Sequence, residues 1–222
     1  MNAATGASGR GQKPAPGAPW FYRKRFAVFG MIYGFSFFLG FAITGIAGLS
    51  PVPVYRALGN PVAFGIVATL LVLTGVALRV WASSYLSAAV MWSEGPVAVQ
   101  LRVSGPYRFT RNPLYLGNVL QALGIAMVTP WLVCALILAG IVLFDYALIL
   151  VEERFLAARQ GEAYASYLAT VGRLFPMLWK IAPDGGQQAS LRDGLRAETS
   201  IGFFAVAAFA IALGLSILNG PR

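Results

Sequence analysis

The chain has 222 residues, of which 58% are hydrophobic and only 11% are charged, and its mean hydropathy is +0.68. These values exclude an ordinary soluble domain and predict an integral membrane protein. The net charge of +9 does not indicate nucleic-acid binding, because the basic residues are spread over the loops between apolar stretches instead of forming one patch.

The first part of the chain predicts a basic tail followed by a membrane helix. Residues 1–25 are rich in Gly, Pro and Ala and are expected to be disordered, with the aromatic cluster Trp20–Phe21–Tyr22 at the lipid interface. Residues 26–60 hold a first span, 26–49, and a short loop. The span would be about 36 Å long as a helix, which is too long for a cleavable signal peptide. Its repeated glycines, Gly30, Gly34, Gly40, Gly45 and Gly48, predict close contact with a neighbouring helix.

Residues 61–180 form the predicted core. A second span covers 61–86, and a polar connection covers 87–112. Residues 114–128 and 132–151 predict a tight helical hairpin broken at Pro130, and residues 152–176 an amphipathic helix. Residues 181–222 hold a polar linker with a break at Gly185–Gly186, followed by a last span over 200–218.

The predicted fold is therefore all-α: a polytopic membrane protein of about five transmembrane helices, with a cytoplasmic amphipathic helix. Most of the 17 Lys and Arg residues lie before the first span, in 87–112, or between 154 and 196, whereas Arg56 and Arg222 lie at the opposite ends of the spans. The positive-inside rule then places the amino terminus and both polar regions in the cytoplasm, at what we take to be a bacterial inner membrane.

Two ionisable residues, Arg79 and Asp145, lie inside predicted spans, each about 10 Å from the cytoplasmic end. An unpaired charge at that depth is costly, so we expect the two to meet as an ion pair or to line one polar cavity. Asn118 and Gln121 are expected either to form hydrogen bonds within the hairpin or to line a ligand pocket.

The stretch from Gly105 to Gly117, GPYRFTRNPLYLG, is the first site candidate. Proline biases the residue before it away from helical geometry, so residues 107–112 should be irregular, with Pro113 in the first turn of the following helix. The free N–H groups of that helix start, beside Arg108 and Arg111, would suit an anion.

The second candidate begins with Glu152 and Glu153 at the end of the fourth span. Further along, Tyr164 and Tyr167 share one helical face, and we interpret them as an interfacial tyrosine belt with solvated neighbours. For the two glutamates a functional role and a structural role both stay open.

At these residues the sequence resembles the isoprenylcysteine carboxyl methyltransferase family, which is related to the phospholipid N-methyltransferases. The resemblance covers about residues 61–180 and rests on an ordered set of motifs: Leu78–Arg79–Val80–Trp81–Ala82, Gly105–Pro106–Tyr107–Arg108, Arg111–Asn112–Pro113–Leu114–Tyr115–Leu116–Gly117, Glu152–Glu153, Gly161–Glu162–x–Tyr164–x–x–Tyr167, and Arg173 to Pro176. It implies an S-adenosylmethionine-dependent membrane enzyme, with the cofactor at the cytoplasmic mouth of the hairpin and a lipophilic or small acceptor entering from the bilayer.

The resemblance also implies roles for individual residues. Arg173 and Glu153 are the expected catalytic residues, with Arg173 holding an anionic acceptor. The expected cofactor-binding residues are Tyr107, Arg108, Arg111, Asn112, Pro113, Leu114, Tyr115, Gly117, Glu152 and Glu153. Among these, Tyr107, Arg111 and the 112–114 backbone would face the cofactor's carboxylate. Glu152 or Glu153 would face its amino or ribose groups.

Several features bound the reaction class. The chain has no histidine, and its one cysteine, Cys134, lies inside an apolar stretch, so histidine-dependent triads, zinc sites with histidine ligands and disulfide frameworks are excluded, and no metal is expected. The family usually has histidine where this chain has Asn112, and proline where it has Gly172. A non-catalytic membrane module of the same fold therefore stays open. A related reductase using NADPH is the third alternative, although no G-x-G-x-x-G element follows a strand.

Overall fold

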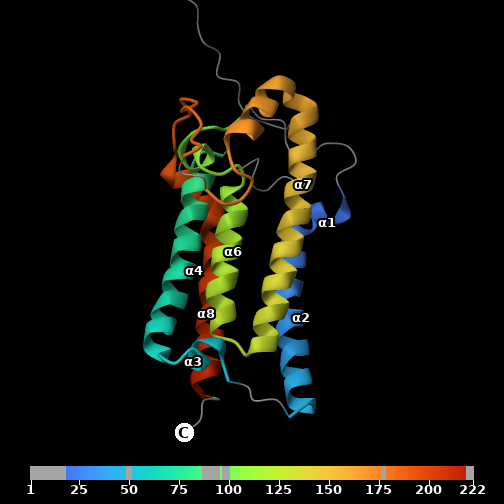
Figure 1. The fold of residues 1–222 in the computed structure, drawn as a ribbon, viewed down its shortest axis with the longest axis vertical. Coiled ribbons are helices and arrows are strands. Elements are labelled where there is room, and N and C mark those ends of the chain that lie inside the picture. Colours follow the sequence, from blue (N-terminus) through green and yellow to red (C-terminus); the bar gives the residue numbers. More distant parts are fainter. Residues whose placement is uncertain (1–18, 49–51, 87–95, 97–100, 177–178, 219–222) are drawn as a thin grey trace, which may run out of the picture.

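The computed structural model describes residues 19–48, 52–86, 96, 101–176 and 179–218, and Figure 1 shows them as a bundle of long helices. In chain order the elements are α1 (Trp20–Arg23), α2 (Arg25–Ile46), α3 (Val54–Ala57), α4 (Pro61–Ser83), the 3-10 helix η1 (Gly105–Arg108), α6 (Pro113–Met127), α7 (Trp131–Thr170) and α8 (Leu191–Leu218). Within these ranges β-structure is limited to two isolated bridges, Pro53 with Pro130 and Thr110 with Gly172.

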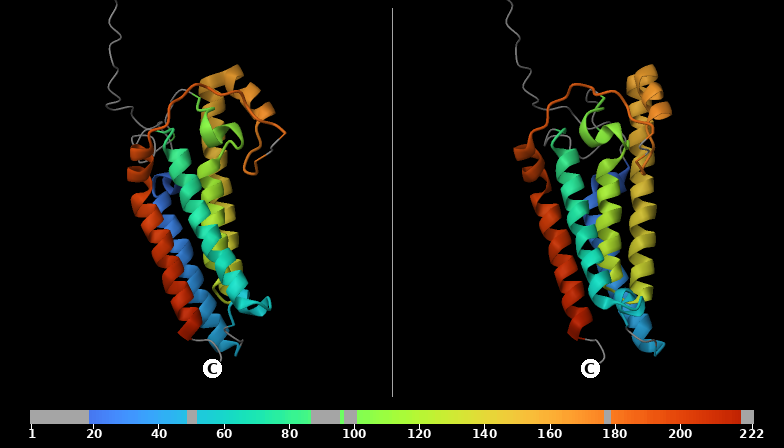
Figure 2. Two further views of the ribbon diagram at one scale, coloured as in Figure 1. Left: turned by 90° about the vertical axis from the view of Figure 1, so that its left-hand side faces the viewer. Right: turned by 60° about the vertical axis from the view of Figure 1, so that its left-hand side comes forward.

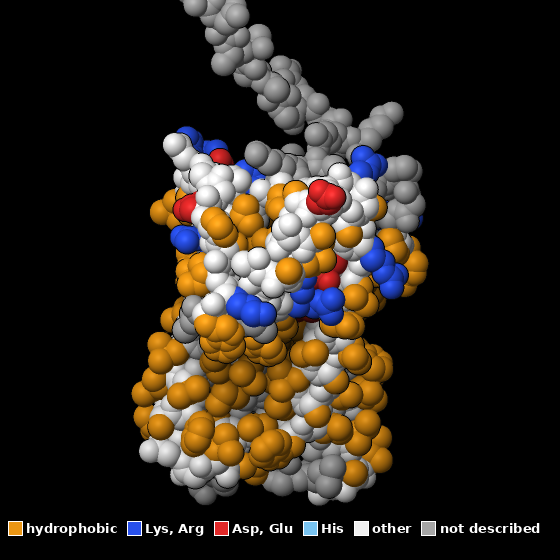
Figure 3. All heavy atoms as spheres, turned by 45° about the horizontal axis from the view of Figure 1, so that its top comes forward, with side chains coloured by type: hydrophobic (Ala, Val, Ile, Leu, Met, Phe, Trp, Pro, Cys, Tyr) orange, Lys and Arg blue, Asp and Glu red, His pale blue; other side chains and the backbone are white. Residues whose placement is uncertain are grey.

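Four helices, α2, α4, α7 and α8, are long and apolar enough to cross a membrane, and α6 is a shorter apolar helix. The expected all-helical, polytopic membrane architecture is therefore confirmed. Figure 3 shows apolar side chains covering the body of the bundle, whereas charged side chains gather at the end that carries the η1 loop. At the other end the α6–α7 turn meets α3, since the Val54 N–H donates to the Thr129 carbonyl at 3.0 Å.

The structure changes three of the predicted boundaries. The amphipathic stretch is the continuation of α7 past a kink at Gly161 (φ 51°, ψ −125°), a left-handed backbone that glycine tolerates. Residues 191–198, expected in a linker, form the first two turns of α8. Residues 20–23 are helical, whereas the rest of the predicted disordered tail, 1–18, and most of the 87–100 connection lie outside the described residues.

Close helix contact occurs between α4 and α6, not along most of α2. A Cβ atom on Gly124 would lie 2.5 Å from the Ala68 carbonyl oxygen, and one on Gly117 would lie 2.9 Å from the Gly75 carbonyl oxygen. A Cβ atom on Gly30 or Gly34 of α2 would meet nothing within 4 Å. The prediction that the α2 glycines serve helix contact is therefore wrong for these two positions. It is confirmed for Gly40, whose Cβ position would lie 3.1 Å from the Val133 Cα of α7.

We predict that Gly124→Leu disrupts the bundle, because the new side chain would meet backbone atoms that cannot move aside. Overpacking of this kind costs about 1–3 kcal/mol or more. Thermal unfolding of the purified protein in detergent should show a clear drop in Tm. Gly214→Leu is the control, because a Cβ atom at Gly214 meets nothing within 4 Å. Equal Tm values for the two variants would contradict this packing.

A buried polar network joins four helices at the level of Arg79. The Arg79 Nε donates to Glu198 Oε2 at 2.7 Å, and Arg79 Nη1 donates to Asn118 Oδ1 at 2.5 Å. The Asn118 Nδ2 in turn donates to Asp145 Oδ1 at 3.0 Å, and the Ser83 hydroxyl donates to Glu198 Oε1 at 2.6 Å. The network therefore ties α4, α6, α7 and α8 together.

This network corrects the predicted pairing of Arg79 with Asp145. The ion-pair partner of Arg79 is Glu198, and the Asn118 amide stands between Arg79 and Asp145. The reason is geometric: Nε and Nη2 of Arg79 reach both carboxylate oxygens of Glu198, a fork that one amide contact to Asp145 does not offer. The alternative, that both residues line one polar cavity, does not hold for the cavities described below, since Arg79 lines two of them and Asp145 lines none. What the two residues share is the Asn118 amide.

We predict that Glu198→Ala strongly destabilises the fold, because it leaves the buried Arg79 guanidinium without its counter-charge. Removing one partner of a buried ion pair costs about 3–5 kcal/mol. Glu162→Gln, on the exposed surface of α7, is the control. The double variant Arg79→Met with Glu198→Met should recover much of the loss in Tm. A Glu198→Ala protein as stable as the control would contradict the role given to this pair.

Candidate functional site

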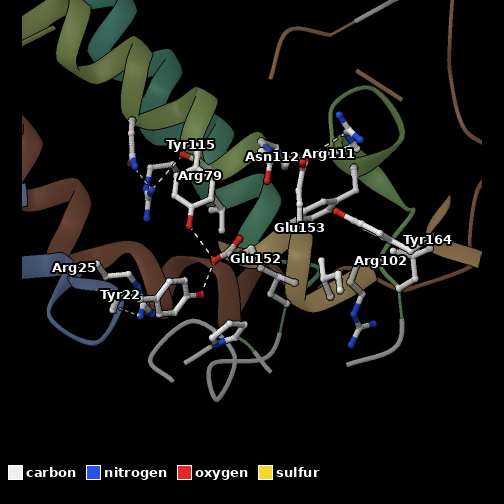
Figure 4. A pocket seen from close by; sticks show the side chains of 18 of the residues that line it. Tyr22, Arg25, Arg79, Arg102, Arg111, Asn112, Tyr115, Glu152, Glu153 and Tyr164 are labelled. Atoms are coloured by element: carbon white, nitrogen blue, oxygen red, sulfur yellow. Dashed lines mark hydrogen bonds and ion pairs between the residues drawn. The ribbon is translucent and has the colours of Figure 1, made fainter. Parts of the chain in front are cut away.

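A cavity of about 180 Å³ lies at the charged end of the bundle, between the loop that precedes α6, the middle of α7 and the start of α2 (Figure 4). Its lining includes Arg111 and Tyr115 from the loop and α6, and Glu152 and Glu153 from α7. The proline-containing loop and the adjacent acids, which lie about 40 residues apart in the sequence, therefore face one another across a single cavity.

The loop is held by the segment that follows α7. The Arg111 N–H donates to the Gly172 carbonyl at 3.0 Å, and the Thr110 hydroxyl donates to the Leu174 carbonyl at 2.8 Å. As predicted, the chain is irregular up to Asn112 (φ −127°, ψ 58°), and α6 begins at Pro113. The loop is thereby fixed at the mouth of the cavity.

The Asn112 side chain is part of this attachment. Asn112 is buried, and its Nδ2 donates to the Arg173 carbonyl at 2.8 Å. A neutral imidazole at this position could provide the same single donor. The structure therefore accounts for asparagine at this position through one hydrogen bond that needs no cationic group.

The two glutamates lie in different surroundings. Oε1 of Glu152 accepts hydrogen bonds from the Tyr22 hydroxyl at 2.5 Å and from the Tyr115 hydroxyl at 2.9 Å (Figure 4). Glu153 instead faces two guanidinium groups, with its Oε1 3.5 Å from Arg111 Nε and its Oε2 3.0 Å from Arg173 Nη2. Glu152 is thus surrounded by neutral phenols, whereas Glu153 is neutralised by arginines.

Three of the predicted site residues do not line the cavity. Arg108 turns away and donates from Nε to the Ala182 carbonyl at 2.9 Å. Gly117 packs against the Arg79 side chain and the α4 backbone. Arg173 lies on the outer side of Glu153, where its Nη1 also donates to the Tyr146 hydroxyl at 3.3 Å. The remaining predicted site residues, from Tyr107 to Tyr115 and Glu152–Glu153, all line the cavity.

Arg108 is bound to residues 179–190, which form a strap that passes over η1 (Figure 2). The Ala182 N–H donates to the Arg108 carbonyl at 3.0 Å. The Ser104 hydroxyl donates to Asp184, and this bond, helped by the Gly186 N–H, holds the pKa of the Asp184 carboxyl below its ordinary value. The strap therefore fixes the outer face of η1, which explains why Arg108 is unavailable to the cavity.

The interpretation of Tyr164 and Tyr167 as an interfacial belt is wrong. Both are buried, and the Tyr167 hydroxyl donates to the Tyr107 carbonyl at 2.6 Å. The kink at Gly161 turns the end of α7 over the loop, as the top of Figure 1 shows, so the tyrosine face meets protein. Both tyrosines line the cavity.

Sequence reasoning missed Tyr22, Arg25 and Arg102 as lining residues. Tyr22 was expected at the lipid interface, yet only 4% of it is exposed. An aromatic cluster followed by basic residues is typical of an interfacial anchor. No local signal distinguishes such an anchor from a tyrosine that donates a hydrogen bond to a glutamate 130 positions away.

We predict that Tyr22→Phe loosens α1, because the hydrogen bond to Glu152 is lost. A bond to a charged group is worth about 1.5–3 kcal/mol, so trypsin should cleave at the exposed Arg23 and Lys24 about tenfold faster or more. Trp20→Phe, which changes a largely exposed side chain of the same short helix, is the control. Unchanged cleavage of the Tyr22→Phe protein would contradict the anchoring role.

Comparison with known proteins finds similarity over the part of the chain that contains the loop before α6 and the two glutamates. Residues 63–163 match the family described as phospholipid methyltransferase. One relative, the cobalt-zinc-cadmium resistance protein CzcN of Cupriavidus metallidurans, is 36% identical over 101 residues, which make up 45% of this chain and 43% of that protein. The similarity therefore spans less than half of either chain. No solved structure matches.

Proposed function

We propose, from the premise that residues 63–163 form a domain of the phospholipid methyltransferase family, that the protein is a membrane methyltransferase using S-adenosylmethionine. The single observation that carries the proposal is one cavity lined both by arginines and by the Glu152 carboxylate, which accepts hydrogen bonds from two phenols. S-adenosylmethionine has an anionic carboxylate, cationic amino and sulfonium groups, and an aromatic base, and the lining offers a complement to each.

The anionic end of the cofactor would face Arg102 and Arg111. The Nε atoms of both residues are buried and have no hydrogen-bond partner among the described residues. Arg111 Nε lies 3.5 Å from Glu153, which is an ion pair but too long for a good hydrogen bond. A carboxylate entering the cavity would supply the missing acceptors, and guanidinium groups bind carboxylates well.

The cationic part would face Glu152. Its two phenol donors hold the carboxylate in place, and its negative charge would stabilise a bound cation. Aromatic side chains line the same cavity, among them Phe26, Phe29 and Tyr107. Aromatic faces also attract cations. Tyr107 stays a neutral phenol, because burial raises its pKa well above the ordinary value.

S-adenosylmethionine would supply a methyl group on a sulfonium for an in-line displacement, which needs neither metal nor covalent nucleophile. The chain's own part would be to hold the reactants in line and to exclude water. The loop, the end of α7 and the strap would close the cavity on the aqueous side. The acceptor would be a lipophilic or small molecule, such as an isoprenoid carboxylate, a lipid amine or a thiol.

The distribution of basic residues supports one orientation of the protein in the membrane. Arg102, Arg108, Arg111 and the basic residues between 154 and 196 lie at the cavity end of the bundle, and the far end has few. By the positive-inside rule the cavity and the amino terminus would face the cytoplasm of a bacterial inner membrane. Topology can be tested with reporter fusions to residues 1 and 222.

The decisive experiment is titration of the purified protein with S-adenosylmethionine, S-adenosylhomocysteine and NADPH. We expect saturable binding of the first two and none of NADPH. Glu152→Gln should weaken S-adenosylmethionine about tenfold or more, because a charge-assisted interaction is lost. Glu162→Gln should have no effect, since it lies outside the cavity.

The alternatives give different results. A folded protein that binds neither adenosyl compound would support the non-catalytic module, and NADPH binding would support the reductase. Arg173 stays a prediction for the acceptor: Arg173→Gln should change the affinity for an anionic acceptor and leave S-adenosylhomocysteine binding unchanged, because Arg173 does not line the cavity.

A further inference from the structure

A second cavity, of about 320 Å³, adjoins the first and lies deeper in the apolar part of the bundle, between α2, α6, α7 and α8. The two cavities share Phe26, Phe29, Arg79 and Asn118 in their linings. The predominant lining of the second cavity is aromatic and aliphatic, and its aromatic residues are Phe26, Phe29, Tyr33 and Phe204.

Among the described residues that line this cavity, one buried side-chain nitrogen has no hydrogen-bond partner. Gln121 is 5% exposed and lines the cavity, and its buried Nε2 has no hydrogen bond among the described residues. An unsatisfied N–H group inside a membrane bundle is costly, and few buried amides are left this way. The amide therefore points to an oxygen atom that a ligand would bring.

Arg79 is the one charged side chain in the described lining of this cavity, and it is already paired with Glu198. Asp145 has a carboxylate oxygen, Oδ2, without a hydrogen-bond partner among the described residues, but Asp145 does not line the cavity. The lining therefore presents no unpaired charge to a ligand. The ligand that fits is therefore neutral.

The outer wall of the cavity opens toward the bilayer. Gly30 carries no side chain and its Cβ position meets nothing within 4 Å, and Phe204 is 52% exposed. The Tyr33 and Phe204 rings meet edge to face, with centroids 6.3 Å apart, and join α2 to α8 beside the opening. These two rings favour a flat ring packed beside them, since aromatic rings prefer edge and offset contacts.

We propose that this cavity binds a neutral lipid whose ring carries an oxygen, such as a quinone carbonyl, with that oxygen accepting a hydrogen bond from Gln121 Nε2. The ring would lie among Phe29, Tyr33 and Phe204, and an attached apolar chain would leave past Gly30 into the bilayer. This binding does not require the proposed methyl transfer.

The test is equilibrium binding of radiolabelled decylubiquinone to the full chain in lipid nanodiscs, with binding to empty nanodiscs subtracted. Decylbenzene, which keeps a ring and a chain but has no oxygen, is the comparison ligand. We expect saturable decylubiquinone binding and at least tenfold weaker decylbenzene binding. Gln121→Leu should weaken decylubiquinone about tenfold, the loss of one buried hydrogen bond, and leave decylbenzene unchanged.

Two glycine variants separate the cavity from the rest of the surface. Gly30→Leu should abolish binding of both ring compounds, because Gly30 lines the cavity opening and a leucine side chain would fill the space beside it. Gly34→Leu, one turn further along α2 and outside the lining, should bind like the wild type. Equal binding by Gly30→Leu and wild type would overturn the site. If the Gln121→Leu protein binds decylubiquinone as the wild type does, the proposed hydrogen bond between Gln121 and the ligand oxygen is overturned.

S-adenosylhomocysteine binding, measured on the same preparations, keeps the two proposals apart. Its absence together with cavity-dependent decylubiquinone binding would refute the methyltransferase proposal and support the ring-lipid site. S-adenosylhomocysteine binding without cavity-dependent decylubiquinone binding would support the methyltransferase proposal and refute the ring-lipid site.

Discussion

The ion pair between Arg79 and Glu198 is the interaction on which the rest of the structure depends. Both side chains are almost fully buried among apolar helices, so each is tolerable only because the other is present. Through Asn118 the pair also reaches Asp145, which connects α4, α6, α7 and α8 at one level. The two cavities meet at this level, since Arg79 and Asn118 line both. The network thus separates a charged chamber near the loops from an apolar chamber in the membrane.

The charged chamber depends on two neighbouring glutamates that have opposite surroundings. Glu153 holds the arginines of the loop and of the segment after α7, and so keeps the loop in place. Glu152 accepts hydrogen bonds from two phenols and is the acid that we propose faces a bound cation. Adjacent acids on one helix can serve different purposes because consecutive side chains point about 100° apart around the helix axis. This division of roles supports the idea of a positively charged cofactor beside Glu152.

The sequence predicted the helices, because hydrophobic length and proline position are local signals. The meeting of the loop with the two acids was implied by the family resemblance and not by any local signal. The sequence could not predict Glu198 as the partner of Arg79, since the acid lies 119 positions away in a stretch that looks like a polar linker. The burial of Tyr22, Tyr164 and Tyr167 was missed for a related reason: an amphipathic tyrosine suits a lipid interface and a protein interface equally well. The Gly161 kink decided between the two, and glycine in a helix does not by itself indicate the direction of a bend.

The central claim is that the chamber beside Glu152 holds S-adenosylmethionine. Ultraviolet crosslinking of methyl-tritiated S-adenosylmethionine to the purified protein, followed by mapping of the labelled peptides, tests it most directly. The account predicts label on peptides that contain residues 107–115 or 152–167, and competition by S-adenosylhomocysteine. Label confined to α3 or the α6–α7 turn, at the far end of the bundle, or no competable label on folded protein, would contradict it.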